Sequence, residues 1–200
     1  LQIQKTIDYY KQHDLLEFIK RFFRKLGFEH FCKTIIFIIL DVSNIPNDIK
    51  KPYSFNPITI DKMQNDKYYS EYFFTKREII DRLQKGHRLF ELKENDKLAY
   101  LLWVEQSNIT ITDFNLPLHI PRHMAYISGG FTAPEFRNRG IASKLKKEIL
   151  CYLKKQGVKQ ILGVVSPSNT TALLIDKKLG FKEYQTLNYK RYWHLRHYVV

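Results

Sequence analysis

The apolar positions of the chain fall into short runs that predict strands and longer amphipathic stretches that predict helices. The strand-like runs are rich in aliphatic and aromatic residues and cover 33–43, 87–93, 98–106, 124–132, 160–166 and 181–200. The first run is short and rich in branched aliphatic residues, which predicts a strand buried on both faces. The "ENDK" between the second and third runs predicts a hairpin, and Gly129–Gly130 predicts a bulge or kink in the fourth. Residues 44–59, with several Pro, Asn and Ser residues, predict a loop.

Helical spacing of apolar residues, with capping residues at the ends, marks the segments 14–27, 75–86, 141–157 and 169–178. Thr75 and Glu78 have the spacing of a capping box, and Gly86 marks the end of that helix. In the third segment one apolar face is formed by Ile141, Leu145, Ile149 and Tyr152. Strands and helices alternate only in the second half, which predicts a single mixed α/β domain over 1–200.

A formal net charge of +13 favours an anionic partner, namely nucleic acid, a membrane surface or a phosphorylated ligand. The alternative is a lysine-rich surface that keeps the protein soluble. The basic residues are dispersed and no nucleic-acid motif is present, so no nucleic-acid partner is expected. The helix predicted at 14–27 has basic residues opposite its apolar face. It either packs on its own domain or makes a peripheral contact with an anionic membrane.

The two cysteines, Cys32 and Cys151, are too few for a disulfide framework, and no Cys/His spacing predicts a zinc site. A cytoplasmic, reducing setting and no bound metal are therefore expected. The longest aliphatic run, 35–40, is far shorter than the roughly 20 residues of a membrane span. Residues 1–14 lack the apolar region of a signal peptide.

The segment 136–145, "FRNRGIASKL", has the composition of an anion site at the start of a helix. The first N–H groups of a helix lack internal partners, and the helix dipole favours negative charge there. Gly140 lets an anion approach these amides closely, and Arg137 and Arg139 add positive charge. The segment lacks the glycines and lysine of nucleotide-binding loops, so alone it also fits an ordinary helix start.

A second motif, "NTTALLIDKKLGF" (169–181), follows one helix and one strand later. This order of strand, "PEFRNRGIA", helix, strand and second motif resembles the GNAT superfamily of acyl-CoA-dependent N-acyltransferases over about residues 85–190. The resemblance implies a central, mostly antiparallel sheet flanked by helices, with strands 124–132 and 160–166 splayed apart to form an acyl-CoA cleft. It also implies acetyl-CoA as the co-substrate and direct attack by an acceptor amine, without a covalent enzyme intermediate.

The resemblance assigns residues to the cofactor. The backbone amides of Arg137, Asn138, Arg139, Gly140, Ile141, Ala142 and Ser143 would hold the pyrophosphate. Phe131 and Ala133 would pair with pantetheine through their backbones, and the Phe131 amide would polarise the thioester carbonyl. Asn169 would face the cofactor arm.

The catalytic residues are less well defined by the sequence. The family's tyrosine acid falls at Asp176, which would donate a proton only if burial raised its pKa. Alternatively, Asp176 is a solvent-exposed helix carboxylate, and Tyr184, Tyr189 or water protonates the thiolate. Glu105 and His123 are candidate bases, and the alternative for each is an ordinary surface residue at the end of a strand.

The sequence therefore predicts an N-acetyltransferase that acts on a small amine or an amino sugar. The alternative is a catalytically impaired module that binds or senses acyl-CoA. The aromatic segment 67–74, "KYYSEYFF", forms either part of an acceptor wall or part of the core. No acceptor, acyl length or oligomeric state is predicted.

Overall fold

The computed structural model describes residues 30–46, 56–59, 75–111, 114–192 and 195–199. Their contacts divide the chain into two compact units, one of residues 36–185 and one that combines 1–35 with 186–200. The helix predicted at 14–27 and the aromatic segment 67–74 lie outside the described residues. The single domain over 1–200 stays a prediction.

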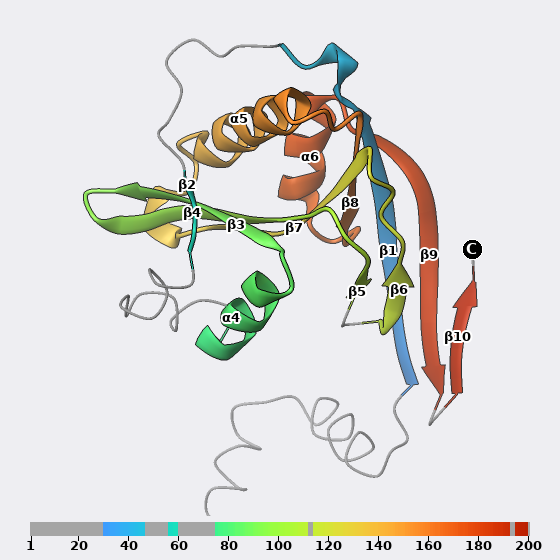
Figure 1. Cartoon of the computed structure of the whole chain (residues 1–200). Coiled ribbons are helices and arrows are strands. Elements are labelled where there is room, and N and C mark those ends of the chain that lie inside the picture. The colour runs from blue at the N-terminus through green and yellow to red at the C-terminus, as the bar shows by residue number, and fades with distance from the viewer. Residues whose placement is uncertain (1–29, 47–55, 60–74, 112–113, 193–194, 200) are drawn as a thin grey trace, which may run out of the picture. The chain divides into compact units, whose positions relative to one another are not determined.

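The larger unit is built on a sheet whose strands lie in the order β1-β8-β7-β4-β3-β2 (Figure 1). Their bounds are β1 His30–Asp41, β2 Asn56–Pro57, β3 Arg88–Glu94, β4 Lys97–Glu105, β7 Met124–Thr132 and β8 Gln160–Val165. Neighbouring strands are antiparallel except β7 and β8, which are parallel. This arrangement confirms the predicted mixed α/β fold with a central, mostly antiparallel sheet.

Helices cover both faces of this sheet (Figure 1). They are α4 Lys76–Gln84, α5 Ile141–Lys155 and α6 Thr170–Leu179. Side chains alternate between faces along a strand. Phe90 and Leu102 therefore belong to the core beneath α5, whereas Leu89 and Trp103 pack with Ile79 of α4. Burial of each such side chain contributes about 1.5–3 kcal/mol, which holds the helices to their faces.

Several local predictions are confirmed. The Thr75 side chain accepts from the Glu78 amide, and the Glu78 carboxylate accepts from the Thr75 amide, which completes the capping box of α4. Asn95 and Asp96 join β3 to β4 with φ values of 51° and 59°, as a tight hairpin turn requires. The apolar face of α5 is turned inward, since Leu145 and Ile149 are fully buried.

Some elements had no clear sequence signal. β5 Ile109–Ile111 and β6 Leu116–Leu118 form a two-stranded ribbon that was not predicted. The two-residue β2 lies in the segment 44–59 that was predicted to be only a loop, because its pairing with β3 is a tertiary contact. Short 3₁₀ turns span Val42–Asn44 (η1) and Pro134–Phe136 (η3).

The predicted closing strands are β9 Lys182–Tyr192 and β10 Leu195–Val199, which pair antiparallel. The smaller unit contains β10 and the part of β9 from residue 186 onward. Within it the strand order is β10-β9-β1, and Thr34 of β1 donates a 2.7 Å hydrogen bond to Asn188 of β9. None of the helices in the described ranges is both long enough and apolar enough to cross a membrane.

Candidate active site

The parallel pairing of β7 with β8 ends early and leaves an opening in the sheet. The last paired residues are Ile127 and Gly163. Beyond them, residues 128–132 of β7, residues 164–165 of β8 and Ser166 line a cleft of about 570 Å³, together with residues of α5 and α6. We call this opening the β7–β8 cleft. It has the splayed geometry that the sequence resemblance implied.

A bulge in β7 shapes one wall of this cleft. The register between β4 and β7 shifts between Leu101 and Trp103, which confirms the bulge or kink predicted at Gly129–Gly130. Gly129 has a φ of 58°, a conformation that side-chain-bearing residues rarely adopt. The shift places one extra residue in β7, so the strand bends where Ser128, Gly129, Gly130 and Phe131 face the cleft.

The start of α5 stands beside the cleft and carries the features of an anion site. Gly140 caps the helix with a φ of 73°, and no atom lies within 4 Å of the place where its Cβ would stand. The first helical hydrogen bond is donated by Lys144, so the amides of residues 141–143 have no partner within the helix. These amides and the open space above Gly140 fit a diphosphate.

Two arginines add positive charge at this end of the cleft. Arg137 lines the cleft, and its Nε donates a 3.1 Å hydrogen bond to the Thr132 carbonyl oxygen. The Arg139 guanidinium lies 5.3 Å from the centre of the Phe136 ring and is exposed. Ala142, the second residue of α5, also lines the cleft.

The structure brings two further predicted residues to the cleft and leaves one aside. Phe131 lines it, and so does Asn169, whose side chain caps α6 by accepting from the Ala172 amide. Ala133 is buried and is absent from the lining. Its amide donates to the Ala99 carbonyl, and its carbonyl accepts from Phe136. A pairing of Ala133 with pantetheine stays a prediction.

A second cavity, of about 920 Å³, opens on the α4 side of the sheet, and we call it the α4 cavity. Its lining includes Arg82 of α4, Glu105 of β4 and Tyr126 of β7. The segment Ser128–Phe131 lines both this cavity and the β7–β8 cleft. The two openings therefore meet at the bulge of β7.

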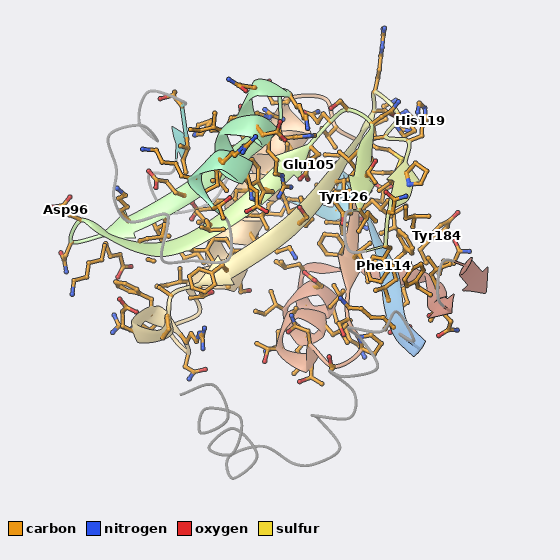
Figure 2. All side chains as sticks on the ribbon, turned by 90° about the horizontal axis from the view of Figure 1, so that it is seen from below. Asp96, Glu105, Phe114, His119, Tyr126 and Tyr184 are labelled. Atoms are coloured by element: carbon orange, nitrogen blue, oxygen red, sulfur yellow. The ribbon has the colours of Figure 1, made fainter. Side chains whose placement is uncertain are left out.

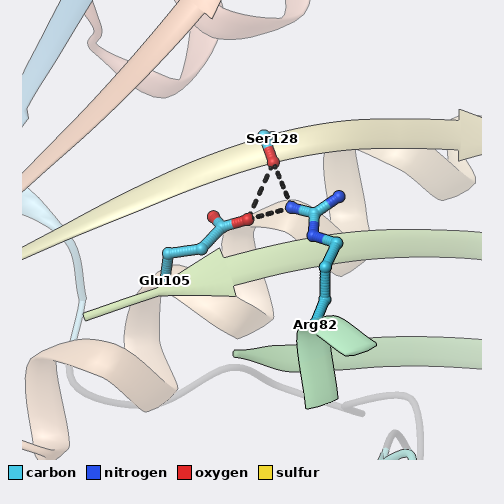
Figure 3. A network of polar contacts seen from close by, with 3 residues as sticks. All are labelled: Arg82, Glu105 and Ser128. Atoms are coloured by element: carbon cyan, nitrogen blue, oxygen red, sulfur yellow. Dashed lines mark hydrogen bonds and ion pairs between the residues drawn. The ribbon is translucent and has the colours of Figure 1, made fainter. Parts of the chain in front are cut away.

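Glu105 is held at this meeting point by a small polar network (Figure 3). Its Oε1 forms an ion pair with Arg82 and accepts a 3.1 Å hydrogen bond from the Ser128 hydroxyl. Ser128 in turn accepts a 3.2 Å hydrogen bond from Arg82 Nη2. Among the described residues, Glu105 Oε2 has no hydrogen-bond partner, although it is buried. A buried carboxylate oxygen without a donor favours the approach of an N–H or O–H group.

Burial raises the pKa of Glu105 to about 7, against the opposing effects of the Arg82 charge and the hydrogen bonds from Ser128 and Arg82. A carboxylate with a pKa near 7 is matched to proton transfer at neutral pH. The structure thus removes the alternative that Glu105 is a surface residue, since it is only 1% exposed.

Arg82 and His87 of the α4 cavity were not identified from the sequence. The Arg82 guanidinium stacks 4.0 Å above the Trp103 ring, which fixes its direction toward Glu105. Burial, followed by the charges of Arg82 and Lys85, lowers the pKa of His87, so this side chain is neutral at pH 7. Neither residue belongs to a motif, because the contacts that give it a role are made across the fold.

One interpretation of Asp176 from the sequence was a solvent-exposed helix carboxylate. This interpretation is wrong, because Asp176 is buried and forms an ion pair with Lys146 of α5. Burial lowers the pKa of Lys146, against the opposing effect of Asp176. Both residues line the β7–β8 cleft.

The other candidates lie elsewhere. His123 is exposed just before β7 and lines neither opening, while its carbonyl accepts from Lys159 and Gln160. Figure 2 shows Tyr184 on the outer edge, well apart from Glu105, and it is 66% exposed. Tyr189 is buried in the smaller unit. No group of three His, Cys, Asp or Glu side chains within the described ranges is arranged to hold a metal ion.

Comparison with solved structures shows the same fold in several acetyltransferases. An acetyltransferase of the GNAT family from Colwellia psychrerythraea is 12% identical, with a TM-score of 0.60 over 82% of this chain and 59% of that one. A GNAT-family protein from Novosphingobium aromaticivorans is 16% identical, with a TM-score of 0.55 over 80% of this chain and 64% of its own. The chain thus spans less than two thirds of either protein.

A ribosomal-protein alanine N-acetyltransferase from Escherichia coli is 15% identical, with a TM-score of 0.50 over 66% of this chain and 79% of that one. At these identities the likeness concerns the fold alone. No curated protein sequence matches the chain.

The sequence itself carries the family assignment. Residues 56–181, more than half of the chain, match the family model described as the acetyltransferase (GNAT) family. The matched range includes both motifs, the splayed strands and the anion site at α5. The chain therefore belongs to the GNAT acetyltransferase family.

Proposed function

We propose that this protein transfers an acetyl group from acetyl-CoA to the amine of a small molecule or an amino sugar, with Glu105 as the general base. The single observation that carries the proposal is the meeting of the two openings at Ser128–Phe131, with Glu105 on the α4 side. An acyl donor and an amine that enter from opposite faces of the sheet would meet there.

The β7–β8 cleft is the proposed donor site. The amides of residues 141–143 and the side chain of Arg137 would bind the diphosphate of CoA. The pantetheine arm would follow the gap between the strands, where residues 128–131 have left the pairing with β8. The Phe131 amide would donate to the thioester oxygen and stabilise the negative charge that develops there.

The α4 cavity is the proposed acceptor site. Its volume lies in the range of pockets that bind small molecules, and its lining mixes charged and apolar side chains. Glu105 would take one proton from the neutral amine, directly or through one water, as the amine nitrogen attacks the thioester carbon. The C–S bond then breaks and CoA leaves with the electron pair. Arg82 and Ser128 orient the carboxylate, and the proton on Glu105 returns to solvent after release of the amide product.

The experiment has two stages. Calorimetric titration of acetyl-CoA should give binding of about one molecule per chain. Release of the CoA thiol is then followed with a panel of amines that includes amino sugars, polyamines and amino acids. At least one amine should be acetylated, and Glu105→Gln should lower kcat by about 10²–10⁴-fold. Glu94→Gln, at the far end of β3 and outside both openings, is the matched control.

The buried Lys146–Asp176 pair at the tyrosine position supports a second candidate, a module that binds acyl-CoA without transferring it. Binding of acetyl-CoA without transfer to any amine would favour this second function. Absence of binding would overturn both. Three predictions from the sequence are separate from this proposal: a cytoplasmic location, the lack of a nucleic-acid partner, and a membrane contact through residues 14–27.

A further inference from the structure

Tyr100 of β4 reaches the place where the two openings meet. Its side chain is 4% exposed and lines the β7–β8 cleft, on the face of the sheet opposite to Glu105. A Cβ on Gly130 would stand 3.1 Å from the Tyr100 hydroxyl oxygen. Gly130 lines both openings, so the hydroxyl lies beside their shared wall. The absence of a side chain at Gly130 leaves room for this hydroxyl.

The Tyr100 hydroxyl can donate a hydrogen bond to a molecule in the cleft. Within the described part of the chain it forms no hydrogen bond to another protein group, and its side chain borders the open cleft. Burial, followed by the negative charge of Asp176, raises the pKa of Tyr100. The group is therefore protonated throughout the neutral and mildly alkaline range, and it can donate in all of it.

We propose that Tyr100 donates a hydrogen bond to the sulfur atom of CoA as the thioester C–S bond breaks. This inference rests on the proposed function, which brings the thioester carbon to the shared wall for attack from the α4 cavity. The sulfur, bonded to that carbon on the cleft side, would then face the Tyr100 hydroxyl. At the position of the family's tyrosine, α6 instead carries Asp176, whose carboxylate is paired with Lys146.

Cleavage of the C–S bond needs no proton transfer from Tyr100. The electron pair of the C–S bond moves to sulfur, and the resulting thiolate is stabilised by the hydrogen bond. The proton stays on the Tyr100 oxygen, because the phenol is a much weaker acid than a thiol. The thiolate takes a proton from water on release, and Glu105 returns the amine proton to solvent.

The test measures the pKa of the thiol of bound CoA, so it needs no acceptor amine. The ultraviolet absorbance of the thiolate is followed against pH for CoA bound to the wild type, Tyr100→Phe and Tyr152→Phe. Tyr152 of α5 lies outside both openings and accepts from Arg88, so it controls for loss of a tyrosine hydroxyl. The ionisable groups facing the cleft, Arg137, Lys146 and Asp176, are the same in all three proteins.

The pKa of the bound thiol should be about one unit higher in Tyr100→Phe than in the wild type, a tenfold change in its ionisation constant. Tyr152→Phe should match the wild type. Calorimetry at pH 6, where the thiol is neutral, should give Tyr100→Phe the CoA affinity of the wild type, because a neutral thiol does not depend on the donor.

An unchanged thiol pKa in Tyr100→Phe would overturn the inference and leave the proposed function standing. A Tyr100→Phe protein that keeps its circular dichroism spectrum but no longer binds CoA at pH 6 would also contradict it. Failure of the wild type to bind CoA would overturn the proposed function itself.

Discussion

Lys146 of α5 and Asp176 of α6 form an ion pair that joins the two helices beside the β7–β8 cleft. Their side chains are only 12% and 3% exposed. Loss of one partner of a buried pair leaves an uncompensated charge, which is costly in a medium of low polarity. Removal of either partner alone therefore destabilises this part of the fold, and the pair also shapes the electrostatics of the cleft.

The first prediction concerns this pair. Lys146→Met should lower the free energy of unfolding by about 3–5 kcal/mol, measured by denaturant titration at pH 7. The double variant Lys146→Met with Asp176→Leu should recover most of that loss. Lys85→Met removes the same kind of group from the exposed Lys85–Asp81 pair on α4, with 63% and 56% exposure, and should cost no more than about 0.5 kcal/mol. Equal losses at the two lysines would show that burial of the Lys146 pair has no energetic role.

The second prediction concerns the pH dependence of acetyl transfer. Because Glu105, the proposed base, can accept a proton only when ionised, kcat should rise with pH, about tenfold per unit, and level off above its pKa of about 7. The residual activity of Glu105→Gln should lack this step, since Gln does not titrate. Initial rates between pH 5 and 9, at saturating acetyl-CoA and amine, would measure both curves. A step of the same size in the variant would assign the titration to another group.

The third prediction is the effect of Glu105 on stability. Its pKa is raised from 4.5 to about 7 in the folded protein, so the folded state binds the proton more tightly than the unfolded state. The stability that this proton contributes is complete below about pH 4.5 and is lost as the pH rises through 7. From the size of the shift, the loss is about 3 kcal/mol.

Glu105→Gln provides the measurement for this effect. Its free energy of unfolding, minus that of the wild type, should become more positive by about 3 kcal/mol between pH 4.5 and pH 8. Groups such as His87 titrate in both proteins, so their contributions largely cancel in the difference. A difference that does not vary with pH would mean that the carboxyl has the same pKa in the folded and unfolded states.

The fourth prediction concerns the anion site at α5. Gly140→Glu should reduce the affinity for CoA by at least about tenfold, because its carboxylate would stand where the diphosphate is proposed to bind. Gly140→Ala is the matched control. Both variants have the same backbone strain at a φ of 73°, and in neither does the Cβ meet an atom within 4 Å. Calorimetry should show that the alanine variant retains far more affinity, and equal affinities would refute the anion site.

The sequence by itself determined the elements whose signals are local. Thr75 and Glu78 cap α4 through contacts three residues apart, and Asn95–Asp96 turn the hairpin through their own backbone angles. The helix start at Gly140 and the bulge at Gly129 are also local, since each needs a φ that glycine adopts at little cost. These signals, in their order along the chain, were enough to identify the fold class and the family.

The tertiary structure decided which side chains make up the site. Glu105 was a candidate from the sequence, but its partners Arg82 and Ser128 lie 23 residues away on either side, and only the packing of α4 and β7 on β4 brings them together. The sequence did not mark Tyr100 as a site residue, because an aromatic residue in an apolar strand is also typical of the core. Asp176 was misjudged as exposed because its neighbours Lys177 and Lys178 suggest a solvated face, whereas its partner is on another helix. Burial and pKa depend on contacts between distant segments, so they emerge only when the sheet and its helices are assembled.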